Sequence, residues 1–231
     1  MRKKLFVVGV LSLLSIFQSC NNGEEISNEK NSSVEKTASS YSSRLTSDSK
    51  TLSGYVANIL ATQTEIKSIL DSESNANFAM IQSGMQNVKT IEDLELLYRN
   101  ANITHIEELI SLYKNISTDS ETFSKSNPEF YSRYTDEERL NLLTQEIDSQ
   151  LGYSEAEGLS ARTNCHAVFM KATRRCMRNY AIEIAGSVAV GVFTGGIGGG
   201  IAAGIATVHM IACNGDADID YHDCVEEGGQ P

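Results

Sequence analysis

Hydrophobic residues between positions 51 and 151 recur at helical spacing. In the first segment they fall at steps of three and four residues, at Leu52, Val56, Ile59, Leu60, Ile66 and Leu70. This is the spacing of an amphipathic helix. A shorter helix is predicted over 77–88. Low proline content, with Pro128 and Pro231 alone, also favours helices.

The second half of this region predicts another helix. Thr135 and Glu138 have the spacing of a capping box, and Pro128 suits a first helical position. An apolar stripe of Leu140, Leu143 and Ile147 follows. The polar, turn-rich segment 117–128 is typical of a connection between helices. We therefore predict an all-α body over 51–151.

A short repeat lies inside the predicted body. The segment 91–100, IEDLELLYRN, resembles 106–115, IEELISLYKN, at an offset of 15 residues. Two units are too few for a solenoid. They are typical of two short helices packed on a common core, and a two-unit binding surface is the alternative.

The pattern breaks at 152–164, where small and polar residues predict an exposed linker. Exposed segments of this kind are preferred sites of proteolysis. Arg162 is the basic residue within it, and we expect cleavage there. Other arginines compete for that role, namely Arg133, Arg139, Arg174 and Arg175.

The region from Ile184 to Val208 contains no charged residue and eight glycines. Eight glycines would cost an isolated helix roughly 8 kcal/mol, so some contact must favour close backbone approach. Glycines recur every four residues in two series, at Gly191, Gly195 and Gly199 and at Gly196, Gly200 and Gly204. Small residues at this spacing form glycine zippers between membrane helices. In the resting protein we expect the segment to be a core hairpin covered by the body.

Four cysteines frame this region, in pairs eleven residues apart. They are Cys165, Cys176, Cys213 and Cys224. Antiparallel arms would pair Cys165 with Cys224 and Cys176 with Cys213, with both midpoints between Thr194 and Gly195. The residues of 214–223 are poor helix formers, so a loop closed by a Cys213–Cys224 bond is the alternative. An even cysteine count in an exported chain indicates disulfides.

The amino-terminal region predicts export. Residues 1–19 combine Arg2, Lys3 and Lys4 with an apolar stretch and read as a secretory signal. The signal ends at Cys20, which we interpret as a lipidated cysteine; an ordinary signal peptide or a short anchor helix is the alternative. Residues 20–50 are rich in Ser, Asn, Lys and Glu and predict a disordered tether.

Charge and motifs exclude several functions. The formal net charge of −11 makes nucleic acid an unfavourable partner. The chain has no phosphate-binding loop and no nucleophile motif, so we expect neither enzyme activity nor a cofactor. The 11-residue cysteine spacings disfavour a four-cysteine zinc site. A calcium loop formed by Asp216, Asp218, Asp220 and Glu227 is disfavoured because Tyr221 occupies the position that needs glycine. A basic cluster could contact anionic lipids or form a solvated helix face, at Lys171, Arg174, Arg175 and Arg178.

Taken together, the signal ending at Cys20, the helical body, Arg162 and the cysteine-framed glycine segment resemble lipoprotein bacteriocins of Bacteroidales. Those toxins are activated by a clostripain-like protease that cuts after arginine. The resemblance implies killing of related strains through membrane damage. It also implies three partners: membrane lipids, an arginine-specific protease and a surface receptor on target bacteria.

The expected organisation is therefore a tether, a helical body over 51–151, a cleavable linker over 152–164 and a disulfide-bonded hairpin module over 165–231. The expected location is the outer membrane or cell surface, with release to the exterior. A second function class is open, a non-enzymatic surface lipoprotein whose glycine segment only packs internally.

Overall fold

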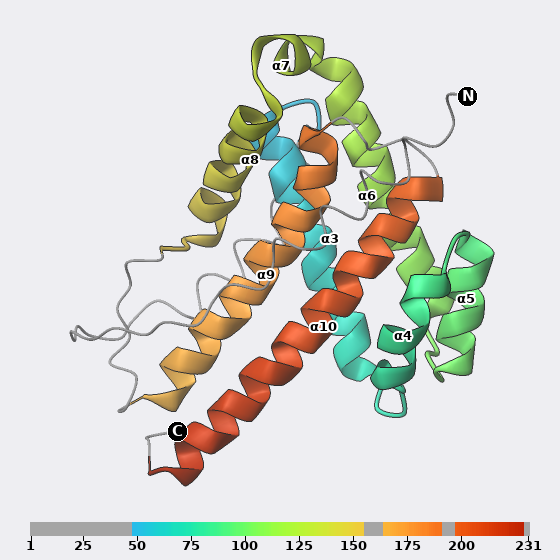
Figure 1. Ribbon diagram of the computed structural model, residues 1–231, viewed down its shortest axis with the longest axis vertical. Coiled ribbons are helices and arrows are strands. Elements are labelled where there is room, and N and C mark those ends of the chain that lie inside the picture. Colours follow the sequence, from blue (N-terminus) through green and yellow to red (C-terminus); the bar gives the residue numbers. More distant parts are fainter. Residues whose placement is uncertain (1–47, 155–163, 191–196, 229–231) are drawn as a thin grey trace, which may run out of the picture.

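The computed structural model describes residues 48–154, 164–190 and 197–228, and its regular elements there are all helical (Figure 1). The predicted all-α class is confirmed. The elements in order are α3 (Leu52–Ser72), α4 (Phe78–Gly84), η2 (Met85–Asn87), α5 (Ile91–Asn100), α6 (Ile106–Ser126), α7 (Pro128–Arg133), α8 (Asp136–Leu151), α9 (Cys165–Ala189) and α10 (Ile197–Glu226). The signal, Cys20, most of the tether and Arg162 lie outside the described residues.

Local capping explains where several helices begin. Thr135 accepts a hydrogen bond from the backbone N–H of Glu138, whose side chain accepts one from the Thr135 N–H, so the predicted capping box is present at α8. Thr90 and Asp93 form the same arrangement at α5. Pro128 occupies the first turn of α7, as predicted. Each cap satisfies backbone N–H groups that a helix start leaves unpaired.

The expected connection over 117–128 is wrong, because α6 continues to Ser126. Tertiary packing accounts for the difference. Ser120 is fully buried, and its hydroxyl hydrogen-bonds that of Tyr55 at 3.1 Å. Phe123 stacks on the Tyr55 ring with centroids 4.8 Å apart. These contacts with α3 hold a polar sequence in helical form.

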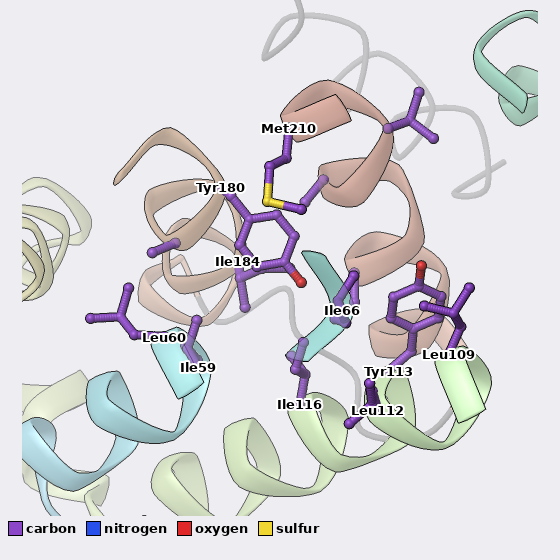
Figure 2. Packing of buried hydrophobic residues seen from close by; sticks show 14 of the residues in the cluster. Ile59, Leu60, Ile66, Leu109, Leu112, Tyr113, Ile116, Tyr180, Ile184 and Met210 are labelled. Atoms are coloured by element: carbon purple, nitrogen blue, oxygen red, sulfur yellow. The ribbon is translucent and has the colours of Figure 1, made fainter. Parts of the chain in front are cut away.

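The body and the hairpin share one hydrophobic core. Figure 2 shows Tyr180, Ile184 and Met210 of the hairpin beside Ile66 of α3 and Ile116 of α6. The two predicted parts, 51–151 and 165–231, therefore pack together around one core in the described residues. The helices α3, α5, α6 and α8 cover the inner face of α9 and α10. Helices α3 to α8 form the body, and helices α9 and α10 form the hairpin.

Candidate functional site

The hairpin consists of two antiparallel helices that lie side by side (Figure 1). Disulfides join Cys165 to Cys224, with Cα atoms 5.7 Å apart, and Cys176 to Cys213, with Cα atoms 5.6 Å apart. The predicted nested pairing is confirmed, and the alternative Cys213–Cys224 bond is wrong. The turn itself, over 191–196, lies outside the described residues.

The acidic end of the hairpin is helical. The segment after Cys213 continues α10 to Glu226 despite its poor helix formers. Two disulfides fix it against α9, and the rings of Phe169 and Tyr221 pack across the arms at 5.6 Å. This rules out the alternative in which the segment is a loop. It also removes the calcium loop, because helical backbone does not wrap oxygen ligands around an ion. The paired cysteines exclude the four-cysteine zinc site.

Two glycines of α10, Gly200 and Gly204, contact the body. Gly199, Gly200 and Gly204 are buried. A Cβ atom at Gly200 would lie 3.0 Å from Ile91 Cδ1, and one at Gly204 would lie 3.0 Å from Leu94 Cδ2. Small residues here let α10 approach α5 closely. The remaining glycines of the two predicted series lie outside the described residues, namely Gly191, Gly195 and Gly196.

The inner face of the hairpin is as buried as the core of the body. Its residues there are at most 5% exposed and nearly all apolar: Tyr180, Ala181, Ile184, Ala185, Val188, Ala189, Ala203, Ala206, Val208 and Met210. The expectation of a core hairpin in the resting protein is confirmed for the described residues.

Helix α8 contacts α9 through two arginines. Arg139 of α8 is 6% exposed, and its Nε donates to the Ala189 carbonyl at 2.5 Å. Arg178 of α9 donates to both carboxylate oxygens of Asp148 of α8, at 2.5 and 3.0 Å. A bidentate arginine–carboxylate pair fixes orientation as well as adding energy. Helix α8 therefore holds the hairpin at two places, near the tip of the hairpin and near the middle of α9.

These contacts were only partly visible in the sequence. The sequence places Arg178 in a basic cluster that could contact lipids, whereas the structure pairs it with Asp148 and places its guanidinium 4.9 Å from the Tyr153 ring centroid. Arg175 is exposed, and Lys171 and Arg174 are half-buried. At most these three residues remain candidates for contact with anionic lipids.

A hydrogen-bonded tyrosine pair explains the short repeat. The equivalent residues Tyr98 and Tyr113 are buried, and their hydroxyls are 2.7 Å apart. Burial raises the pKa of Tyr113 to about 12, although the Thr207 and Tyr98 hydroxyls oppose the shift. The pKa of Tyr98 is raised well above its usual value, first by burial. The repeat thus builds a core, and the tyrosines are neutral structural groups beneath α10.

A second polar cluster caps α6. The Glu73 carboxylate accepts hydrogen bonds from the backbone N–H of Thr104 and of His105, both at 2.9 Å. Burial tends to raise the pKa of Glu73, but the hydrogen bonds from His105 and Thr104 outweigh burial and lower it. This contact joins α3 to the start of α6, and no sequence motif indicated it.

The exposure of each arginine distinguishes the alternatives to Arg162 as the site of proteolytic cleavage. Arg139 is buried inside the core contact with Ala189. Arg174 and Arg175 lie on α9 between two disulfide-bonded cysteines, so a cut there would leave the fragments joined. Arg133 is exposed on α7. The residues that flank the linker on the described sides, Ser154 and Asn164, are exposed.

No helix in the described part of the chain combines the length and the apolar character that a membrane crossing needs. Comparisons with protein-family models, curated proteins and solved structures find no match to this chain.

Proposed function

We propose that this chain is a lipid-anchored antibacterial toxin that perturbs target membranes with its hairpin after cleavage of the linker at Arg162. One observation carries the proposal. Both disulfides lie inside the hairpin, and the body contains no cysteine. The linker is therefore the sole covalent connection between an apolar hairpin and the body that covers it.

The disulfides make the hairpin a unit that keeps its form outside the core. The outer bond joins residues 59 positions apart. Closing a loop of that length is worth about 4 kcal/mol in the chain-entropy model. Two bonds at the open end keep the arms antiparallel, while the uncharged residues lie toward the tip.

The uncharged stretch suits a bilayer when the arms enter together. The uncharged stretch from Ile184 to Val208 gives each arm about 12 residues, which as a helix measure roughly 18 Å. That length is shorter than the roughly 30 Å hydrocarbon core of a bilayer. A hairpin of this size would thin the bilayer or assemble with other copies. Membrane lipids are thus the expected ligand.

The resting contact contains a polar group that weakens it. Gln63 of α3 donates to the Met177 carbonyl of the hairpin, but its buried Oε1 atom has no hydrogen-bond partner among the described residues. Such a group costs about 1–3 kcal/mol. This penalty offsets part of the gain from apolar burial, which favours a hairpin that can leave the core.

The proposal assigns a partner to each step. Lipid at Cys20 holds the body at the cell surface, an arginine-specific protease cuts the linker, and a receptor on the target bacterium recruits the toxin. The body helices would remain with the anchor, since they lie on the Cys20 side of the cut.

The test is killing of related bacteria by the mature chain, intact and after limited cleavage by an arginine-specific protease. We expect killing only after cleavage. Arg162→Gln should prevent activation, whereas Arg133→Gln, which removes an exposed arginine of α7, should leave activation unchanged. Equal killing by intact and cleaved protein would refute activation by cleavage.

A non-enzymatic surface lipoprotein is the second candidate. The observation in its favour is that Gly200 and Gly204 serve a contact inside the protein. Under this function the glycines need no membrane partner. Absence of killing and of vesicle leakage after complete cleavage would select it.

A further inference from the structure

The body forms a binding surface whose occupant is the hairpin. The helices α3, α5, α6 and α8 line this surface. The hairpin residues that fill it are 0–2% exposed: Tyr180, Ile184, Val188, Ala203, Ala206 and Met210. Neither disulfide crosses between the two parts. After a cut within 155–163, every contact between them is noncovalent.

One residue of the body recognises the tip of the hairpin. Ala189 ends α9, and the last carbonyls of a helix have no partner within it. Arg139 Nε supplies a donor to the Ala189 carbonyl at 2.5 Å. A cation at this end also complements the helix dipole.

The rest of the Arg139 guanidinium is held by the body itself. Its two Nη atoms donate to the carbonyls of Tyr131 and Tyr134 and to the Asp136 carboxylate. The guanidinium carbon lies 5.2 Å from the Tyr131 ring centroid. These contacts, all within the body, fix the orientation of the guanidinium whose Nε faces Ala189.

We infer that the body is a noncovalent inhibitor of the hairpin, that it keeps the hairpin bound after the linker is cut, and that Arg139 is the anchor of this contact. Cleavage then makes release possible but does not cause it. A bilayer, which offers the hairpin another apolar environment, completes the release. The conclusion that the body inhibits the hairpin rests on the proposed function. The noncovalent binding of the hairpin by the body does not depend on it.

The test cuts the chain at a defined place. A recognition sequence for a site-specific protease is inserted between Glu157 and Gly158 of a mature chain tagged at its amino end. After cleavage under oxidising conditions, the hairpin retained by the immobilised body is measured over a dilution series. We expect the cleaved protein to retain the hairpin, and to lose it when vesicles are added.

Variants identify the anchor. Arg139→Ala should weaken retention roughly 10- to 100-fold, the usual effect of removing a charged hydrogen-bond donor. Arg139→Lys keeps the charge but lacks the planar guanidinium, so its retention of the hairpin should fall between that of Arg139→Ala and that of the unmodified protein. Arg133→Ala is the matched control, because that guanidinium is exposed and lies over the Tyr134 ring at 5.7 Å. Its retention should equal that of the unmodified protein.

Two results would overturn the inference. Immediate loss of the hairpin from the unmodified body would show that the body does not bind it. If the Arg139→Lys body retains the hairpin as well as the Arg133→Ala body does, Arg139 is not the anchor. This comparison still applies if the Arg139→Ala protein does not fold. Neither result depends on killing. A toxin that kills but releases its hairpin at once would leave the proposed function intact and this inference refuted.

Discussion

Replacing Gly204 with leucine should destabilise the protein, whereas the same change at Gly215 should stabilise it. Both glycines lie in α10, so both substitutions improve helix propensity by about 0.8 kcal/mol. Gly215 is exposed, and a Cβ atom there would have no neighbour within 4 Å. Its replacement should therefore give the propensity gain alone.

Packing reverses the outcome at Gly204. A Cβ atom there would already lie 3.0 Å from Leu94 Cδ2, and Leu94 is fully buried. Three further carbons have no space without displacing α5. Overpacking of this kind costs about 1–3 kcal/mol, and occasionally more. The two variants should differ in stability by that amount.

Thermal unfolding followed by circular dichroism at 222 nm measures the difference. In a chain of this size, each kcal/mol shifts Tm by about 2–4 °C. The Gly204→Leu protein should therefore melt roughly 2–12 °C below the Gly215→Leu protein. Equal melting temperatures, or a higher one for Gly204→Leu, would refute the contact between the glycine face and α5.

Three further changes have defined outcomes. Glu73→Gln should cost about 1–2 kcal/mol at neutral pH, because the carboxylate caps α6. The pKa of Glu73 is lowered in the folded protein, so the stabilisation is present above pH 4.5 and is lost as pH falls through the folded-state pKa. Urea unfolding of both proteins as a function of pH would measure this loss. Removing the inner disulfide with Cys176→Ser and Cys213→Ser should cost about 2–4 kcal/mol in urea unfolding. Tyr98→Phe should cost about 1–2 kcal/mol by the same measurement, since it removes the 2.7 Å hydrogen bond to the buried Tyr113 hydroxyl.

Each of these expectations has a contradicting result. A stability loss in Glu73→Gln that stays constant from pH 7 to pH 3 would show that the carboxylate charge is not involved. Unchanged unfolding without the inner disulfide would mean that core packing alone fixes the arms. For the tyrosine pair, Tyr134→Phe is a half-buried control, and an equal loss in both variants would contradict the role assigned to burial.

Much of the fold was readable because it depends on local signals. The capping box at Thr135 predicts the start of α8, and helical spacing predicts α3. The nested cysteines predict the antiparallel hairpin, since two equal spacings around one glycine run admit a simple pairing.

The errors share a cause, which is that tertiary contacts override local composition. Ser120 and Phe123 are helical because they pack on Tyr55, and the acidic end of α10 is helical because disulfides bind it to α9. Long-range contacts could not be predicted from the sequence either. The Arg139 bond to Ala189 spans 50 positions, and no sequence pattern specifies it.

Dye release from vesicles of bacterial lipid tests the central claim most directly. The mature chain is added intact and after cleavage at the engineered linker site, under oxidising conditions. The account predicts that intact protein leaves the vesicles sealed and that cleaved protein releases the dye, with the hairpin fragment recovered in the vesicle fraction. Sealed vesicles after complete cleavage, with the hairpin still bound to the body, would contradict it.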